Sequence, residues 1–188
     1  MVRYAVLTGQ MAWLGPVDKM VRPDGYVTCD CTEGFDCDWP ADAYPGGKRS
    51  WYRSVDLIVT VGWRHLVPRD ILEATPLGVV GFHSARLPEY PGRAPVPWAI
   101  LRGDEFTANT MLFLTDEPDA GDIIDSRTIP VTTASEMNRR MGETAAEMLR
   151  QHLPALLAGT APRKPQDRSR RGPLTTADGW QRLPEALR

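Results

Sequence analysis

Apolar and polar residues alternate along this chain in short blocks, a pattern typical of strands that are separated by helices and turns. The block at 55–63 is almost uninterrupted and rich in β-branched residues, which suits a strand covered on both faces. Several other blocks end at a glycine or a polar turn, as strands commonly do. Strands are predicted at residues 4–9, 25–31, 55–63, 78–83, 108–116 and 121–131.

Helical periodicity is clearest after residue 132, where Thr133 and Glu136 have the spacing of a capping box. Gly159, with a proline close behind it, predicts the end of this helix. Shorter helices are expected at 68–75, which begins with proline, and at 94–104. Residues at three- and four-position spacing predict the buried stripe of the long helix: Met137, Met141, Ala145, Met148, Leu149, His152, Leu153 and Leu156.

Strands that alternate with helices predict an α/β fold with a mostly parallel sheet flanked by helices. Residues 1–160 are expected to form one domain, and the polar, proline-rich residues 161–188 a tail that packs on it or trails from it. Ligands of such sheets bind beyond the carboxyl ends of the strands. The ends to consider are Trp63, His83 and the acidic turn at 116–119.

Composition narrows the class of protein. Of the 188 residues 42% are apolar and 24% charged, an ordinary globular balance, and the net charge of -2 argues against a nucleic-acid partner. No apolar run approaches the roughly 18 residues that span a membrane. The amino-terminal residues lack the features of a signal peptide, so we expect a cytoplasmic protein. A homodimer is compatible with these features.

Three cysteines, Cys29, Cys31 and Cys37, lie in or beside a predicted loop at 32–50. Their number is odd and they form no C-x-x-C pair, while a structural zinc site needs four ligands. His65 or His83 could complete such a set, but both lie in other sequence contexts. We therefore expect reduced thiols in a cytoplasmic protein, and no metal site.

His83 and the acidic turn "DEPDAGD" at 116–122 are the candidate chemistry. Taken separately, a histidine bonded to a loop carbonyl and a solvated turn are ordinary structural features. Taken together, an imidazole and a carboxylate at two strand ends can form a proton-transfer pair, since the carboxylate orients the ring and stabilises its cation.

The segment from "GFHSARLPEYPGRAP" through "WAILRG" to "PDAGD" resembles the core of the formyltransferases that use 10-formyltetrahydrofolate. The matching elements are the histidine, a Leu-Pro loop with a glycine, a Trp-Ala-Ile helix, a strand with a threonine, and an aspartate 36 positions after the histidine. The ending "PQD" to "DGW" is also similar to the family. The resemblance is strong from about 55 to 133, fair at the tail and weak over 10–54.

The resemblance implies a Rossmann-like fold and transfer of a formyl group from the folate to an amine. His83 would polarise the formyl carbonyl, Asp119 would orient His83 and help to remove the amine proton, and Thr110 would sit beside them. The resemblance also implies a folate pocket. Its expected residues are Trp63, Arg64, His65, Leu66, Val67, Leu87, Thr115, Asp116, Glu117 and Pro118.

Gly81 stands where the family has an asparagine that donates to the developing oxyanion. Loss of one such donor costs about 10²–10³ in rate. A backbone N–H or water near Gly81 could replace it, another side chain could substitute, or the protein could bind without catalysis. Asn109 is a poor substitute, because neighbours on a strand face opposite ways, and if Thr110 points at the site Asn109 points away from it.

The acceptor side differs from the family as well, because Arg86 and Arg93 add cations that suit an anionic acceptor. Relatives that formylate methionyl-tRNA carry a second domain and a basic surface, of which the sequence gives no sign. We expect a small-molecule amine, either on a nucleotide-linked sugar or on a biosynthetic amino acid or aminoacyl group; a folate- or nucleotide-binding homologue without catalysis is the alternative. Expected acceptor-side residues are Gln10, Ser84, Arg86, Tyr90, Gly92 and Arg93.

Overall fold

The computed structural model describes residues 4–8, 25–28, 51–63 and 65–188. The side chains of residues 4–8 and 25–28 are not among the described features. Several sequence-based expectations fall elsewhere in the chain. The loop at 32–50, the three cysteines, Gln10 and Arg64 lie outside the described residues.

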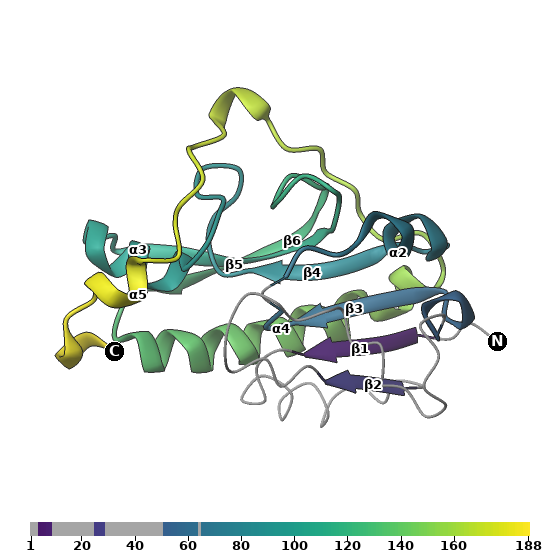
Figure 1. The fold of residues 1–188 in the computed structure, drawn as a ribbon, viewed down its shortest axis with the longest axis horizontal. Coiled ribbons are helices and arrows are strands. Elements are labelled where there is room, and N and C mark those ends of the chain that lie inside the picture. The colour runs from purple at the N-terminus through teal and green to yellow at the C-terminus, as the bar shows by residue number, and fades with distance from the viewer. Residues whose placement is uncertain (1–3, 9–24, 29–50, 64) are drawn as a thin grey trace.

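Six strands form one mixed sheet, and each corresponds to a strand predicted from the sequence (Figure 1). The order across the sheet is β2-β1-β3-β4-β5-β6. Strands β2, β1, β3 and β4 are parallel, whereas β5 runs antiparallel to β4 and to β6. Their bounds are β1 Tyr4–Thr8, β2 Gly25–Thr28, β3 Leu57–Val61, β4 Val79–His83, β5 Phe106–Phe113 and β6 Ile123–Pro130.

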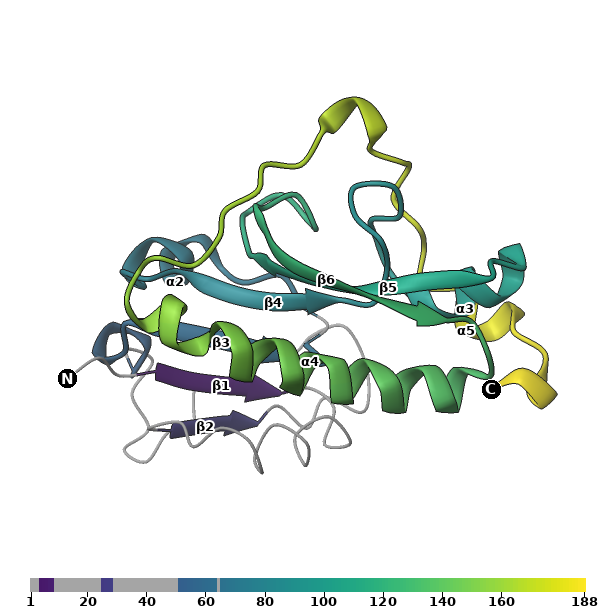
Figure 2. The same ribbon diagram turned by 180° about the vertical axis from the view of Figure 1, so that it is seen from behind.

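Helix α4 (Ala134–Leu157) lies across one face of the sheet and closes the larger core (Figure 2). Met137, Met141 and Met148 are fully buried against strand residues of that face, which confirms much of the predicted stripe. The Thr133 side chain caps the helix by accepting from the amide of Glu136 at 3.4 Å. The Glu136 carboxylate binds arginines of the next turn instead of completing the capping box.

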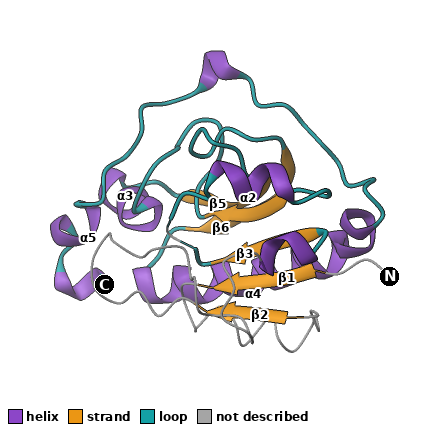
Figure 3. Ribbon diagram, turned by 45° about the vertical axis from the view of Figure 1, so that its right-hand side comes forward, coloured by secondary structure: helices purple, strands orange, loops and turns teal. Residues whose placement is uncertain are grey.

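Shorter helical elements lie at the ends of the sheet, on its other face and in the chain that follows α4. A second core cluster on that face joins Tyr52, Val55 and Ile58 to Val67, Ile71 and Val79. Figure 3 shows these elements as helical turns between long loops. Their bounds are η1 Trp51–Ser54, α2 Arg69–Ala74, α3 Pro95–Arg102, η2 Arg168–Arg170, α5 Gly179–Arg182 and η3 Glu185–Leu187.

The chain after α4 arches over the loops that rise from β4 and β5, and then descends to α5 beside α3 (Figures 1 and 3). We call residues 164–175 the strap. One end of the strap pairs Lys164 with Ile123 in an antiparallel bridge, and the other pairs Thr175 with Gly92 in a parallel bridge. The polar tail predicted from the sequence is therefore joined to the rest of the molecule by backbone hydrogen bonds at both ends of the strap.

Candidate functional site

Strand alternation puts the candidate residues on the face of the sheet opposite α4. Val80 and Met111 point into the core under α4, so their neighbours Gly81 and Thr110 point the other way. His83 lies two residues beyond Gly81 and opposite Thr110 in the antiparallel register, so all three share one face. This is the arrangement that the sequence predicts for His83 and Thr110.

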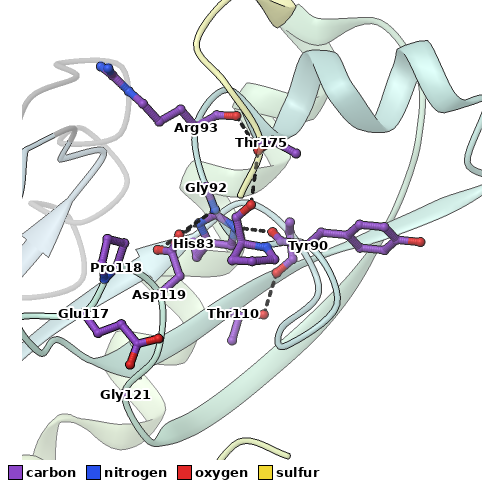
Figure 4. Close-up of polar contacts among 12 residues, drawn as sticks. His83, Tyr90, Gly92, Arg93, Thr110, Glu117, Pro118, Asp119, Gly121 and Thr175 are labelled. Carbon is purple, nitrogen blue, oxygen red and sulfur yellow. Dashed lines mark hydrogen bonds and ion pairs between the residues drawn. The ribbon is translucent and has the colours of Figure 1, made fainter. Parts of the chain in front are cut away.

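His83 is buried, with 7% of its side chain exposed, and both ring nitrogens face oxygen atoms (Figure 4). Nε2 lies 2.8 Å from the carbonyl oxygen of Tyr90, and Nδ1 lies 3.3 Å from Oδ1 of Asp119. A ring with a proton on each nitrogen satisfies both acceptors, whereas a neutral ring that donates to Tyr90 turns a lone pair towards the carboxylate. The His83 ring is therefore held between two oxygen atoms, one from the main chain and one from the Asp119 carboxylate.

Asp119 reaches His83 by a different route from the one that the sequence suggests. β5 runs antiparallel to β4 and ends at Phe113, which lies opposite Val80, three residues from the His83 end. The segment 114–122 must therefore turn back by about 10 Å along the sheet face to bring Asp119 to His83. The carboxyl ends of the parallel strands β3 and β4 lie at the same edge of the sheet. Asp119 reaches this edge because the turn after the antiparallel strand β5 folds back towards it.

The backbone of this turn is itself unusual at Asp119, which has a φ of 53° in the left-handed region. Its second carboxylate oxygen, Oδ2, accepts a hydrogen bond of 2.8 Å from the amide of Gly92. Asp119 thus contacts His83 through one oxygen and the loop 84–92 through the other (Figure 4). The carboxylate is oriented by two partners from different parts of the chain.

Thr110 supports the same loop from below. It is fully buried and donates to the carbonyl of Ala85 at 2.7 Å, and its hydroxyl lies 3.2 Å from that of Ser126. These contacts place Thr110 beside His83, as expected, with its hydroxyl bonded to the start of the loop. The geometry gives Thr110 a supporting position in the site.

The space beside Gly81 is already occupied. A Cβ atom at this position would lie 2.7 Å from Oγ1 of Thr60 and 2.9 Å from Cδ2 of Leu114. Leu114 N donates to Val79 O, so the alternation of an antiparallel ladder makes Gly81 and Leu112 the next hydrogen-bonded pair. The Gly81 amide is then committed to the sheet, which argues against a backbone donor at this position.

Asn109 points away from the site, as strand alternation predicts. Its Nδ2 donates to the carbonyl of Met141 at 2.8 Å and to Oγ1 of Thr144 at 3.0 Å, both on α4. The side chain is fully buried between the sheet and this helix. Asn109 therefore joins β5 to α4 and cannot replace an oxyanion donor near His83.

The segment expected to line a folate pocket lies after β3, on the His83 face. The rings of Trp63 and His65 meet edge to face with centroids 5.6 Å apart, and Leu66 is 64% exposed. Trp63 packs against the same core cluster as Leu114, while the side chain of Val67 is buried within that cluster. Leu87, on the loop after β4, is also buried.

The turn residues 115–118 lie close to the beginning of α2. The pKa of Arg69 is raised by its hydrogen bond and ion pair with Glu73, and further by the charge of Asp116. Thr115 Oγ1 donates to the carbonyl of Glu117 at 2.9 Å, and the Glu117 carboxylate pairs with Arg168. The structure thus brings the acidic turn and the start of α2 together beside the His83 face.

The expected acceptor-side residues occupy the loop 84–92 and its margin. Tyr90 offers its carbonyl to His83, but its ring points away, with the Arg102 guanidinium 4.1 Å from the ring centroid (Figure 4). Arg86 is exposed and pairs with Glu89 at 3.9 Å, and the Arg93 side chain extends away from His83. Ser84 is half-buried at the start of the loop.

Two residues of the strap, Gln166 and Arg171, bind backbone carbonyl groups of the acidic turn, and neither was among the sequence-based candidates. Gln166 Nε2 donates to the carbonyls of Asp119 and Gly121 at 2.9 and 2.8 Å. Arg171 donates to the carbonyls of Pro118 and Asp119 at 2.6 and 3.3 Å. The "PQD" motif was the available signal, but the sequence does not say which carbonyl groups it would meet.

Within the described ranges, no three His, Cys, Asp or Glu side chains gather as a set of metal ligands. In the same part of the chain, no helix has both the length and the apolar character needed to span a membrane.

The mixed sheet with its helices is that of a Rossmann-like domain. On this sheet, buried His83 and the Asp119 carboxylate form a candidate proton-transfer site. The formyl transferase family model matches residues 50–156, more than half of the chain. The chain belongs to the formyl transferase family.

Methionyl-tRNA formyltransferase from Listeria monocytogenes serotype 4a is 37% identical over 115 residues, which are 60% of this chain and 37% of that protein. The chain thus spans little more than a third of the curated relatives that it matches.

Solved structures share the fold. A sugar N-formyltransferase from Shewanella sp. superimposes with a TM-score of 0.72 at 14% identity, covering 93% of this chain and 76% of that one. The formyltransferase PseJ from Anoxybacillus kamchatkensis, solved with UDP-4,6-dideoxy-4-formamido-L-AltNAc and tetrahydrofolate, gives 0.68 at 18% identity, covering 95% and 88%. These similarities confirm the expected Rossmann-like fold.

Proposed function

We propose that this protein is an N-formyltransferase that moves the formyl group of 10-formyltetrahydrofolate to a small-molecule amine. The observation that carries the proposal is the pairing of His83 with Asp119, with 3.3 Å between Nδ1 and Oδ1. Membership of the formyl transferase family supports it, and so does the tetrahydrofolate bound in a structure of similar fold.

The pair suits the chemistry of the transfer. The amine nitrogen attacks the formyl carbon, the bond between that carbon and the folate nitrogen breaks, and the proton lost by the amine returns to the departing folate nitrogen. The His83 ring polarises the formyl carbonyl and stabilises negative charge on its oxygen, and Asp119 accepts the amine proton directly or through a water.

The contact between the two side chains is the place where the reacting groups would enter. Its 3.3 Å exceeds the 2.7–2.9 Å typical of charge-assisted hydrogen bonds, and Asp119 is the more exposed partner at 21%. Trp63, His65 and Leu66 with the turn 115–118 would flank the folate, whose flat ring system suits the aromatic and apolar side chains on this face. Leu87 and Val67 support these walls from beneath.

For the acceptor we favour an amino group on a nucleotide-linked sugar, with an amino acid or aminoacyl group as the second class. The exposed arginines Arg86 and Arg93 on the loop after β4 give an anionic acceptor a counter-charge. PseJ, which shares the fold, binds a UDP-linked formamido sugar, whereas the curated relatives are named for methionyl-tRNA.

The filled space beside Gly81 favours a second candidate function, a folate- or nucleotide-binding homologue without catalysis, because the family's donor cannot be accommodated next to Thr60 and Leu114 as they stand. The test is to incubate the protein with 10-formyltetrahydrofolate and a UDP-linked amino sugar, methionyl-tRNA or free amino acids, and to follow release of tetrahydrofolate. Release with one acceptor supports the enzyme and identifies the acceptor class. Folate binding without release on any amine supports the binding homologue, and a fully active His83→Ala variant contradicts the assigned site.

A further inference from the structure

The acidic turn that carries Asp119 is held from outside by the strap. In the described residues, three carbonyl groups of the turn, those of Pro118, Asp119 and Gly121, accept hydrogen bonds from Gln166 or Arg171 of the strap. Arg168 adds an ion pair of 2.9 Å to Glu117. The contacts concentrate on the residues next to the carboxylate that faces His83.

Gln166 is central to this arrangement. One side-chain nitrogen reaches the carbonyls of Asp119 and Gly121 at 2.9 and 2.8 Å, and its two hydrogens match these two acceptors. The opposite orientation of the amide would turn its oxygen towards both carbonyls, so the donor assignment follows from the partners. Gln166 therefore links the main chain on the two sides of Ala120 in the turn.

The turn needs such support because Asp119 has a φ of 53°, a conformation that residues with a side chain rarely adopt. Strained backbone of this kind persists when the surrounding structure determines it from several sides. The side chain of Asp119 is fixed by Gly92 and faces His83, while its carbonyl is fixed by Gln166 and Arg171. Loosening the carbonyl side lets the residue rotate and moves the carboxylate away from Nδ1.

The strap also fixes the loop on the opposite side of His83. Thr175 pairs with Gly92 and its Oγ1 donates to the carbonyl of Arg93 at 2.7 Å, while the Gly172 amide donates to Pro88. Tyr90, whose carbonyl meets Nε2 of His83, lies between these attachment points. The strap thus binds the segments that carry both hydrogen-bond partners of the His83 ring.

We propose that Gln166, assisted by Arg171, is a positioning residue that fixes the Asp119 carboxylate at Nδ1 of His83 by holding the carbonyl groups of the turn. This inference rests on the proposed function for its effect on turnover. Its geometric part concerns the relation of Asp119 to His83 in the protein without substrate, and it can be tested there separately.

The substitution Gln166→Glu keeps the size of the side chain and replaces the donor by an oxygen that faces two carbonyls. The matched control is Lys164→Met, on an exposed side chain two positions earlier in the strap. The first measurement is the ¹⁵N spectrum of the imidazole groups at one pH. The chain has three histidines, so His83→Gln assigns the His83 signals, and His152, bonded to Asp125 at 2.9 Å, is an internal reference.

We expect Gln166→Glu to move the Nδ1 signal of His83 in the same direction as Asp119→Asn does, while the His152 signals and the Lys164→Met spectrum stay unchanged. With an acceptor that the tetrahydrofolate-release assay identifies, kcat should fall about 10²-fold, the loss that a displacement of about 1 Å can cause, with little change in KM for the folate. Where Gln166→Glu does not fold, Arg171→Lys, which keeps the charge but loses the planar guanidinium, tests the same contacts.

An unchanged His83 signal in a folded Gln166→Glu or Arg171→Lys protein overturns the inference, whatever the activity. A shifted signal without turnover on any acceptor, even in the native sequence, supports the positioning role and counts against the proposed function. A shifted His83 signal in Gln166→Glu with an unchanged kcat would show that the position of the Asp119 carboxylate does not limit turnover. That result overturns the role of Gln166 in catalysis.

Discussion

The amide of Gly92 and the carboxylate of Asp119 are joined by a hydrogen bond of 2.8 Å that links the loop after β4 to the turn after β5. The two residues are 27 positions apart in the chain. The bond leaves Oδ1 of Asp119 directed at His83, so the carboxylate cannot rotate without breaking a contact to the main chain.

Replacing the carboxylate by an amide tests the chemical role of Asp119. Asp119→Asn retains an oxygen for the Gly92 amide but removes the charge that faces Nδ1 of His83. Loss of general acid–base assistance typically costs 10²–10⁴-fold, so we expect formyl transfer to fall by about that factor. The rate of tetrahydrofolate release is the measurement.

The control for this change lies on the same turn. Asp122→Asn alters a carboxylate that pairs with Arg163 at 3.7 Å, away from His83, and should leave the rate near that of the native protein. Equal losses in the two variants would show that the turn tolerates no substitution, and would remove the argument for a specific role of Asp119.

A side chain at Gly92 should destabilise the fold for two reasons that can be separated. Its φ is 111°, and a Cβ atom would lie 2.3 Å from the backbone nitrogen of Thr175 in the strap. Gly103 shares the positive φ, at 70°, but a Cβ there meets nothing within 4 Å. Gly103→Ala therefore measures the backbone strain alone, about 1–2 kcal/mol.

We expect Gly92→Ala to lower the free energy of unfolding by roughly twice as much as Gly103→Ala, because overpacking adds about 1–3 kcal/mol to the strain. Chemical denaturation of both variants gives the comparison. Similar losses at the two positions would mean that the strap moves aside freely at Thr175, contrary to the close approach described above.

The space beside Gly81 should behave as if Leu114 and Thr60 fill it. Gly81→Asn alone is expected to destabilise the fold by about 1–3 kcal/mol, since its Cβ would approach both side chains closer than 3.0 Å. Leu114→Ala, introduced together with Gly81→Asn, opens this space. In a double-mutant cycle measured by denaturation, the double variant should lose less stability than the sum of the losses of the two single variants.

Additive losses in that cycle would show that Leu114 does not exclude a side chain from position 81. The cycle uses stability alone, so it is independent of the acceptor. It therefore distinguishes a site whose donor space has been filled from one whose space is simply open.

The beginning of α4 should depend on pH through Glu136. Hydrogen bonds from Arg139 and Arg140 lower the pKa of this carboxyl group to about 2 from its ordinary value of 4.5. Because the folded-state pKa is depressed, the stabilisation is present above pH 4.5 and is lost as the pH falls from there towards 2. Glu136→Gln should therefore be less stable than the native protein at pH 7, with a difference that closes at low pH.

Urea denaturation at pH 7 and near pH 3 measures this difference, and added salt should reduce it because the groups are exposed. Glu147→Gln, on an exposed carboxylate farther along α4, is the control. A difference between Glu136→Gln and the native protein that is independent of pH would contradict the ionic origin.

The residues that the sequence placed correctly are those governed by local periodicity. The two-residue period predicts that Asn109 and Thr110 face opposite ways along β5, and with Thr110 placed beside His83 by the family resemblance it directs Asn109 to the other face, where it bonds to α4. The Thr133 cap and the methionine stripe of α4 follow equally from short-range rules. The pairing of His83 with Asp119 came from the resemblance to a family, and the geometry agrees with it.

The residues that the sequence did not reveal act over long separations. Gln166 meets Asp119 across 47 positions, and Arg171 meets Pro118 across 53. Contacts between side chains and carbonyl groups at such distances leave no periodic trace in the chain. The antiparallel direction of β5 could not be predicted either. A strand that is buried on both faces has a nearly continuous apolar pattern, and this pattern does not give its direction relative to its neighbours.

The strap described above joins the two halves of the site, which has a consequence for exchanging parts between relatives. The acidic turn presents the carbonyl groups of Pro118, Asp119 and Gly121 to the strap, and Gln166 and Arg171 donate hydrogen bonds to them. A turn of different length or shape would present these carbonyls elsewhere and leave the donors of the strap unmatched. In a chimaera of two relatives, the turn and the strap should therefore be exchanged together. The residues at positions 166 and 171 should co-vary among homologues with the length and sequence of the turn.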